Sequence, residues 1–400
     1  MDLNNVYGAL LNLPNVSIEG LRIEKNAILI DCSLIKSDNI CPHCGQINKV
    51  VNDTKIRTLQ DLNISGREVF LSVKVRQFYC LDCDKYHTEI LDFADSHKSY
   101  THRQSKFIFL LCKKQTYKEV GAIMNLNSKT VERIVLKHSQ ALVNRHEAWS
   151  RVKRIGIDEQ SHRKGKGSYF CILTDLDSGV ILEMLPDRKK QTLVDYFQSL
   201  GEEICTRITD VSCDIWSTYI QVARQCLSQA RIVLDRFHVV KLLNESLDNY
   251  RKTLRKAHKD NDIFKRLKWI LYKQHHMLTD RELDDLEASF KEDPKLKAFY
   301  FKRDAFHQIL DNNTDVNQAV EQIKQWIKTA KEDGLTIFDK FSKTVQKWKI
   351  NVANYVKDKV TNATTEGLNN LIRVVKRFSY GMPNFEHLRL RALVISNDFH

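Results

Sequence analysis

Proline and glycine are scarce in this sequence, which contains 5 Pro and 13 Gly among 400 residues. This composition excludes a collagen-like or low-complexity chain and indicates a folded, helix-rich protein with short linkers. No run of about 18 uninterrupted apolar residues is present that could span a bilayer. Residues 1–20 also lack the basic start and continuous apolar segment of a signal peptide. We therefore expect a soluble, cytoplasmic protein without internal repeats or a membrane partner, divided into about two to four domains.

Basic residues outnumber acidic ones, and the formal net charge is +13. The excess is concentrated in residues 98–154, which contain 13 Lys or Arg but only 3 Glu. A local surplus of this size indicates an anionic polymer as partner. The chain also has 10 Cys, four of which are paired by their spacing. In a reducing compartment such pairs favour a metal over a disulfide.

The four paired cysteines predict a zinc ribbon. They lie in the segments CPHCG and CLDC and are Cys41, Cys44, Cys80 and Cys83. The segment REVFLSVKVRQFYC alternates apolar and polar residues, so the second pair should end a strand. Each Cys-x-x-Cys turn presents two thiolates, and together they can hold one structural Zn²⁺ in a tetrahedron. His43 and His87 are nearby alternative ligands, and free buried cysteines or a redox pair are alternatives to a metal. Alternating runs around Glu24–Asn26 predict a further hairpin.

Helical patterns within the basic segment predict a helix-turn-helix. Lys118–Asn125 and Lys129–His138 are joined by a short turn, and Ser128 can cap the second helix. Asn125 stands where a glycine is often found in such turns. An ordinary helical linker with a solvated basic face is the alternative. If the second helix enters a DNA groove, the residues that it offers are Lys129, Thr130, Arg133 and Lys137.

After Arg154 the pattern predicts an α/β domain. The runs RIGIDEQ, SYFCILTDL and GVILEMLPD indicate three antiparallel strands, after which helices and strands alternate as far as ARIVLDRF. This is the order of the ribonuclease H-like fold, a mixed sheet with helices on both sides. Asp158 lies in the first strand and Asp214 at the end of the fourth. Glu159 and Asp210 are competing choices in the same strands.

A basic amphipathic helix near the C-terminus, ATTEGLNNLIRVVKRFSYG, contains one acidic residue, Glu366. At about 100° per residue, Glu366 shares an exposed stripe with Asn370, Arg373 and Arg377. Its alternative role is to complement the helix macrodipole. Three carboxylates can hold two Mg²⁺ (or Mn²⁺) ions, which stabilise both oxygens of an in-line phosphoryl displacement. The predicted catalytic and magnesium-binding residues are Asp158, Asp214 and Glu366, and the predicted contacts to the DNA backbone on this helix are Arg373, Lys376 and Arg377.

Four segments of the sequence are distinctive, namely IDEQSHRKGKGSYFCILTDLDSG, VSCDIWSTYI, VLDRFHVVKLLNESLD and TTEGLNNLIRVVKRFSYGMPNFEHLRLRAL. They closely resemble the ISL-three family of bacterial insertion-sequence transposases. The likeness runs from about Cys41 to the C-terminus. It implies an N-terminal zinc-binding domain and a helix-turn-helix ahead of a DDE catalytic domain, with the DDE acids at Asp158, Asp214 and Glu366. Asp235 and His238 match a family motif and are expected to support the metal ligands.

Together these patterns predict five segments. They are a β region with a zinc ribbon (1–95), a helix-turn-helix domain (96–150), the first part of a ribonuclease H-like core (151–243), a helical insertion (244–361) and the C-terminal helices of the core (362–400). The insertion is identified by resemblance. Its tryptophans are expected to be core anchors, since aromatic residues at helical spacing usually pack; they are Trp269, Trp326 and Trp348.

The expected function is that of a DNA transposase that binds terminal inverted repeats and catalyses strand cleavage and strand transfer. We expect a nucleoid-associated homodimer on double-stranded DNA, because two ends must be held together. The sequence offers no convincing Ser or Tyr motif for a covalent protein–DNA intermediate. Two alternatives remain at this point: a DNA-binding regulator derived from a transposase, and a ribonuclease H-like nuclease that cuts without joining.

Overall fold

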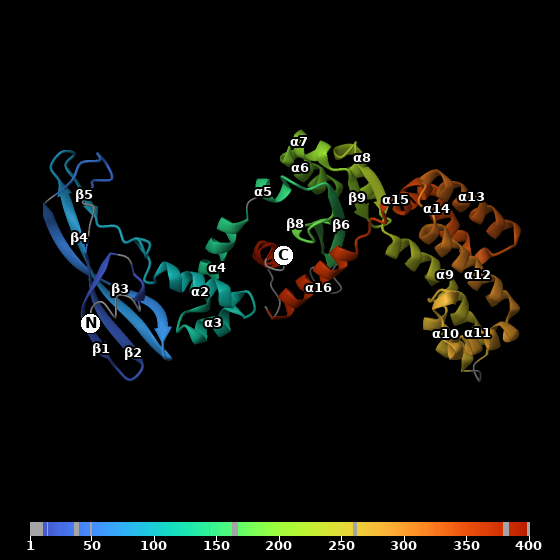
Figure 1. The fold of residues 1–400 in the computed structure, drawn as a ribbon, viewed down its shortest axis with the longest axis horizontal. Helices are drawn as coiled ribbons and strands as arrows, with labels where there is room; N and C mark the ends of the chain where they lie inside the picture. The colour runs from blue at the N-terminus through green and yellow to red at the C-terminus, as the bar shows by residue number, and fades with distance from the viewer. Residues whose placement is uncertain are drawn as a thin grey trace. The chain divides into compact units, whose positions relative to one another are not determined.

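The computed structural model describes most of the chain, in the ranges 11–13, 15–35, 40–48, 50–143, 145–161, 167–258, 262–378 and 384–397 (Figure 1). The chain forms two compact units. The first comprises residues 1–142 and 375–391, and the second comprises residues 143–374 and 392–400. The finer division into five segments remains a prediction. Within the described ranges, no helix combines the length and the apolar composition needed to cross a membrane.

The first unit begins with a mixed sheet. Its described strands are β1 (Val16–Ile23), β2 (Ala27–Leu34), β3 (Val51–Ile64), β4 (Arg67–Cys80) and β5 (Lys85–Thr88). Their order is β1-β2-β4-β3, with β5 paired to β4. β1 and β2 form the hairpin expected around Glu24–Asn26. The alternation predicted for β4 is confirmed, because the apolar side chains of one face are buried, namely Val69, Leu71, Val73 and Val75.

Three helices follow the sheet in this unit, α2 (His102–Cys112), α3 (Tyr117–Ile123) and α4 (Ser128–Leu142). The turn between α3 and α4 passes through Asn125, whose φ of 49° lies in the left-handed region that asparagine tolerates. Gly121 allows this turn to pack closely, since a Cβ there would lie 2.6 Å from the carbonyl oxygen of Leu126. The Asn127 side chain accepts a 2.8 Å hydrogen bond from the backbone N–H of Lys129. Asn127 therefore caps α4, and the prediction of Ser128 as the cap was wrong.

Buried polar contacts attach these helices to β3. Asp61 is fully buried and accepts hydrogen bonds from Arg103 and from the Thr101 hydroxyl, both at 2.7 Å. Gln60 donates to the carbonyl of Met124 over 3.0 Å. Because buried charged groups are stable only when paired, these contacts fix the helices on the sheet.

The second unit contains another mixed sheet, whose described strands have the order β10-β9-β6-β7-β8. The antiparallel meander consists of β6 (Arg154–Ser161), β7 (Tyr169–Asp175) and β8 (Ile181–Leu185). The strands parallel to β6 are β9 (Asp210–Cys213) and β10 (Arg231–Leu234). The helices between β8 and β10 are α6 (Lys190–Leu200), α7 (Glu202–Arg207) and α8 (Ser217–Cys226). The meander and its alternating continuation agree with the sequence pattern, although α7 had no signal of its own.

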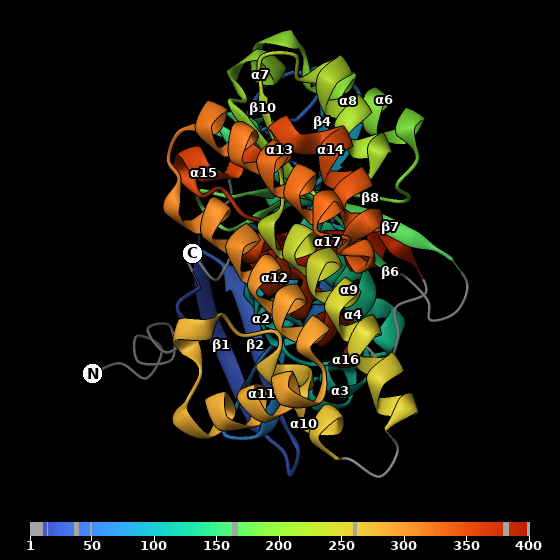
Figure 2. The ribbon, with the colours of Figure 1, turned by 90° about the vertical axis from the view of Figure 1, so that its right-hand side faces the viewer.

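A helical segment separates β10 from the last two helices (Figure 2). Its α-helices are α9 (Arg236–Ala257), α10 (Ile263–Ile270), α11 (Asp280–Glu292), α12 (Pro294–Asn312), α13 (Val316–Glu332), α14 (Asp339–Ala353) and α15 (Tyr355–Asp358). Trp326 is buried and Trp348 packs against the core as expected, but Trp269 is 66% exposed. The prediction of Trp269 as a core anchor was wrong: α10 buries Phe264 and Leu267, and Trp269 lies off that face.

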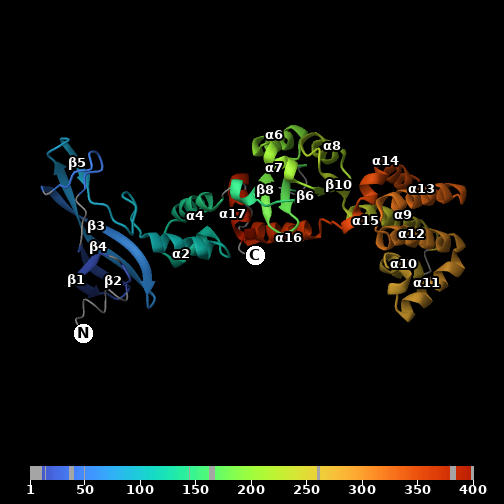
Figure 3. The same cartoon turned by 45° about the horizontal axis from the view of Figure 1, so that its top comes forward.

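The last helices within the described residues are α16 (Ala363–Phe378) and α17 (Phe385–Asn397). α16 runs past the second sheet (Figure 3), and its N-terminal end is attached to β6. There the side chain of Asn362 donates to the carbonyl of Ile157 over 3.4 Å, and the Thr365 hydroxyl lies 2.7 Å from that of Thr174 on β7. The residue opposite them on β6 is Gly156, which has no side chain to prevent this close approach. The first turn of α16 is therefore held against the centre of the sheet.

Candidate functional site

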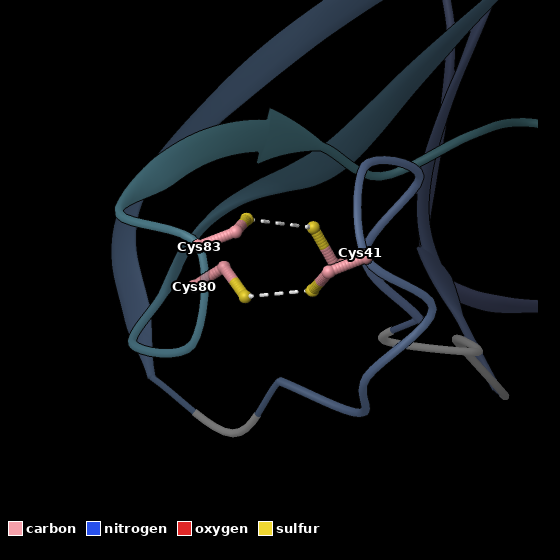
Figure 4. A group of neighbouring side chains, drawn as sticks. Cys41, Cys80 and Cys83 are labelled. Atoms are coloured by element: carbon pink, nitrogen blue, oxygen red, sulfur yellow. Dashed lines mark hydrogen bonds between the residues drawn. The ribbon is translucent and has the colours of Figure 1, made fainter.

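The four paired cysteines meet at one point in the first unit. All four sulfurs lie within 4.8 Å of one another, with Cys41 3.6 Å from Cys83 and Cys44 3.5 Å from Cys80. Figure 4 shows Cys80 and Cys83 on one loop facing Cys41 on the other. Disulfide sulfurs are about 2.05 Å apart, whereas thiolates that share one tetrahedral Zn²⁺ at about 2.3 Å are about 3.8 Å apart. The spacing therefore fits a Zn²⁺ site and does not fit a disulfide.

The two cysteine turns have the same backbone form. The residue after each pair, Gly45 or Asp84, has a positive φ and donates its N–H to the carbonyl of the first cysteine over 2.9 Å. Burial acts to raise the pKa of Cys41, but backbone N–H groups and the neighbouring thiols outweigh it and lower the pKa to about 6. A thiolate at this position is the form that binds metal. His87 stacks on Phe78 and is not needed in the ligand set.

The predicted acids of the second unit line one cavity of about 580 Å³. Asp158 comes from β6, Asp214 directly follows β9, and Glu366 lies in the first turn of α16. The remaining side chains that matter for its chemistry are Glu159, Asp235, Arg236, His238, Asn369 and Arg373. Residues separated by more than 200 positions in the sequence thus meet where β6, the end of β9 and the first turn of α16 come together.

Asp158 is a half-buried member of the acidic set. Burial and, next, the negative charge of Asp214 raise its pKa to about 6. Its Oδ1 accepts the backbone N–H of Glu159 over 2.7 Å, and its Oδ2 accepts the side-chain N–H of Asn369 over 2.6 Å. A carboxylate whose pKa is raised by a neighbouring carboxylate marks a concentration of negative charge, which hard divalent cations would relieve. The donor set therefore fits Mg²⁺ or Mn²⁺.

Asp214 is held in an ion-pair cluster with two residues of the LDRFH segment. The Nδ1 of His238 lies 2.7 Å from Asp214 and 3.2 Å from Asp235. Burial acts to lower the pKa of His238, but the hydrogen bonds to both carboxylates outweigh it and raise the pKa to about 10. Within the described residues, the ligand atoms of Asp214, Asp235 and His238 lie within 4.8 Å of one another. These three side chains form a compact group, and sequence reasoning gave Asp235 and His238 only a supporting place.

The two competing acids are engaged elsewhere. Glu159 lines the cavity, but its carboxylate accepts hydrogen bonds from Arg188 over 2.5 Å and from the Tyr219 hydroxyl over 2.7 Å. Asp210 pairs with Arg231 at 2.6 Å and does not line the cavity. Each alternative is thus paired with an arginine, Arg188 or Arg231, and Asp158 and Asp214 remain the predicted residues.

The stripe expected on α16 is exposed along its length. Glu366, Asn370, Arg373 and Arg377 are all exposed, and Ile372 on the opposite side is buried. Arg373 lines the cavity and donates to the Asn370 side chain over 2.5 Å. Lys376 is half-buried and lies outside the stripe.

On α4 the predicted DNA contacts also reach solvent. Lys129, Arg133 and Lys137 are exposed, and Thr130 is half-buried. Arg133 donates to the Thr130 hydroxyl over 3.2 Å, and Lys137 pairs with Asp95 at 2.5 Å.

Sequence reasoning missed two asparagines that attach α16 to the acidic site. Asn362 donates its backbone N–H to Asp235 over 3.3 Å, and Asn369 donates to Asp158. The spacing of three residues between Glu366 and Asn369 was the available signal, since it places both on neighbouring turns of one helix face.

Comparisons with known proteins cover both the cysteine-containing segment and the segment that contains the cavity. A family model described as a transposase, of the ISL3 type, matches residues 155–392. A second, described as the zinc finger of transposases IS204, IS1001, IS1096 and IS1165, matches residues 38–83 and agrees with the four-cysteine site. The transposase for insertion sequence element IS1001 from Bordetella parapertussis is 25% identical over 365 residues, covering 90% of this chain and 89% of that protein. The transposase for element IS1557 from Mycobacterium tuberculosis is 24% identical over 386 residues, covering 88% and 85%.

Proposed function

Because the chain belongs to the ISL3 family of transposases, we propose that it binds the terminal inverted repeats of an insertion sequence and catalyses DNA strand cleavage and strand transfer. One observation carries this proposal: Asp158, Asp214 and Glu366, from distant parts of the chain, line the same cavity. The names of both relatives given above agree with it.

The catalytic core of the proposed enzyme is ribonuclease H-like. The antiparallel meander β6–β8 followed by the parallel strands β9 and β10 supports this assignment. The helical segment α9–α15 is then an insertion between the last strand and the helix that bears Glu366. It is attached to the core through Asn351 and Asn354, which donate to the carbonyl of Ile232 on β10 over 3.2 and 2.8 Å.

Asp158, Asp214 and Glu366 would hold two Mg²⁺ or Mn²⁺ ions. Bound there, the ions would stabilise the attacking and leaving oxygens of an in-line phosphoryl displacement. Asp235 and His238 orient Asp214 through the ion pairs described above. Arg373, at the rim of the cavity, offers a guanidinium to a DNA phosphate. In the first reaction water attacks a phosphodiester, whose bond to the 3′ oxygen breaks to leave a 3′-hydroxyl and a 5′-phosphate. In the second, that 3′-hydroxyl attacks a phosphodiester of target DNA and displaces a 3′-hydroxyl of the target strand.

In this proposal the first unit of the protein recognises the transposon ends. α3 and α4 form a helix-turn-helix whose second helix presents Lys129, Thr130, Arg133 and Lys137 to the DNA. Arg377 and Lys376 extend the basic surface on α16. Since two transposon ends must be joined, the active form is a homodimer on DNA.

Three substitutions test the catalytic assignment. Asp158→Asn, Asp214→Asn and Glu366→Gln should each reduce strand cleavage by at least about 10³-fold, because each removes a charged ligand of the cations that act on the reacting phosphate. Binding of end DNA should stay within about threefold of the wild type, since the first unit is unchanged. Asp195→Asn and Glu203→Gln, at exposed positions away from the cavity, are the matched controls. Cleavage at the wild-type rate by any of the three variants would refute the role of that residue.

The regulator and nuclease alternatives make different predictions. A regulator would bind end DNA and leave it uncut in the presence of Mg²⁺ or Mn²⁺. A nuclease would cut but would form no joined product. An assay with labelled ends and a supercoiled target plasmid separates all three, because only a transposase gives both the nicked end and the joined product.

A further inference from the structure

We propose that Asn369 is a fourth member of the divalent-cation site, where its amide nitrogen holds Asp158 in place and its amide oxygen is a further ligand. This inference rests on the proposed function. Asn369 follows Glu366 by three residues on α16, so the two side chains project from adjacent turns of one face, and both line the cavity.

The amide nitrogen is fixed by its contact with Asp158. Asn369 Nδ2 lies 2.6 Å from Asp158 Oδ2. The reversed amide would bring its oxygen against a carboxylate oxygen at the same short distance, where two acceptors repel. The orientation is thus set by chemistry. With the Glu159 N–H on Oδ1, each oxygen of Asp158 has one hydrogen bond and keeps lone pairs for a cation.

The amide oxygen is left without a donor as a consequence. Asn369 is 6% exposed, and within the described part of the chain its Oδ1 is buried and has no hydrogen-bond partner. A buried polar atom without a partner costs about 1–3 kcal/mol. An amide oxygen is one of the hard oxygen ligands that Mg²⁺ and Mn²⁺ accept. A cation shared with Asp158 would satisfy this atom.

A purely structural role for Asn369 can be separated from this one. The main-chain carbonyl of Asn369 accepts the Gln160 side chain over 3.0 Å, a contact that attaches α16 to β6. Gln160→Ala loosens the same helix without touching the amide of Asn369. Asn370, the next residue, is exposed and serves as a second control.

Mn²⁺ titration followed by electron paramagnetic resonance tests the proposal on the full-length protein. Asn369→Ala and the nearly isosteric Asn369→Leu should each weaken Mn²⁺ binding by about 10- to 100-fold, the usual effect of losing a partner of a metal ligand. Gln160→Ala and Asn370→Ala should stay within about twofold of the wild type. Thermal unfolding of each variant reports whether the fold is kept.

The outcomes distinguish a failure of the Asn369 proposal from a failure of the proposed function. If the wild type binds Mn²⁺ and both Asn369 variants bind it equally well, the role of Asn369 is refuted while the three-acid site stands. If Gln160→Ala weakens binding as much as Asn369→Leu does, helix attachment explains the effect and the proposal is also refuted. If the wild type binds no Mn²⁺, the cation site fails and the proposed function fails with it.

Discussion

Gly156 on β6 and Thr365 on α16 approach so closely that a Cβ on Gly156 would lie 2.6 Å from the Thr365 hydroxyl oxygen. The same Cβ would lie 2.5 Å from the Thr174 hydroxyl and 2.7 Å from the side-chain oxygen of Asn362. These groups are buried, and the two hydroxyls are hydrogen-bonded to each other. The contact therefore sets how near the first turn of α16, and Glu366 with it, comes to the strand that bears Asp158.

Gly156→Ala should displace the first turn of α16. We expect a loss of about 1–3 kcal/mol in the free energy of unfolding, the usual cost of overpacking, and a reduction in strand cleavage of at least about tenfold. Gly367→Ala is the matched control, because a Cβ at Gly367 has no atom within 4 Å. It should be neutral or stabilise α16 by up to about 1 kcal/mol. Unfolding in urea and a cleavage assay measure both effects, and wild-type cleavage by Gly156→Ala would show that this contact does not position Glu366.

Loss of one cysteine ligand should remove the zinc. Cys80→Ser is expected to lower the zinc content from about one ion per chain to near zero, because a hydroxyl is a poor ligand for this thiolate site. The β4–β5 end of the first sheet should then unfold locally, since a structural Zn²⁺ contributes folding energy directly. Elemental analysis and protease sensitivity measure these changes. Cys226→Ser, at a half-buried cysteine outside the site, should keep its zinc; full zinc in Cys80→Ser would contradict the four-thiolate site.

The raised pKa of Asp158 predicts a pH-dependent effect of Asp158→Asn. With divalent cations removed by a chelator, Asp158 of the folded wild-type protein ionises only above about pH 6, because its pKa is raised to about 6. In the unfolded protein the same side chain ionises above about pH 4. The folded protein thus binds the extra proton between these values, and its stability falls as pH rises through this window. Asp158→Asn should therefore raise the free energy of unfolding above pH 6 by about 1–3 kcal/mol, and this gain should shrink towards pH 4.

Denaturation of both proteins at pH 4.5 and pH 7 tests this difference, with the exposed Asp195→Asn as control. An equal effect of Asp158→Asn at both pH values would show that the environment of Asp158 is not the one described here.

The exposed cations of α4 should contribute to end binding through phosphates or bases. Arg133→Ala and Lys129→Ala are each expected to weaken binding of end DNA by about 1–3 kcal/mol if they contact bases. If they contact phosphates only, the slope of log K against log salt should fall by about 1 for each. Lys106→Ala, which removes an exposed charge from α2, is the control for net charge. The affinity of each variant for end DNA is measured by fluorescence anisotropy at several salt concentrations. If both the affinity and its salt dependence are unchanged, α4 is excluded from the DNA interface.

Local patterns predicted the elements that carry the two sites. The alternation in β4 and the two Cys-x-x-Cys pairs were sufficient to place the cysteines, because turn and strand chemistry act over a few residues. The period of α16 predicted its exposed stripe for the same reason. Trp269 shows that residue type alone does not predict burial. Its position in the helical period places it away from the buried Phe264 and Leu267, and this position leaves it exposed.

Contacts between distant segments could not be predicted in this way. The hydrogen bond from Asn369 to Asp158 joins residues 211 positions apart, and no short-range pattern encodes such a pair. The engagement of Glu159 by Arg188 and Tyr219 likewise depends on how β6, α8 and the loop after β8 pack together. Which of the two adjacent acids pairs with Arg188 and Tyr219 was therefore open until the fold was known.

The place of the helical segment between β10 and α16 has a consequence for synthesis. A ribosome completes the cysteine site and all five strands of the second sheet before it makes Ala363. Until then, Asp158 has no Asn369 and the cavity has no Glu366. A nascent or prematurely terminated chain that ends before Ala363 therefore lacks these components of the cavity, and under the proposed function such a chain would not cut DNA.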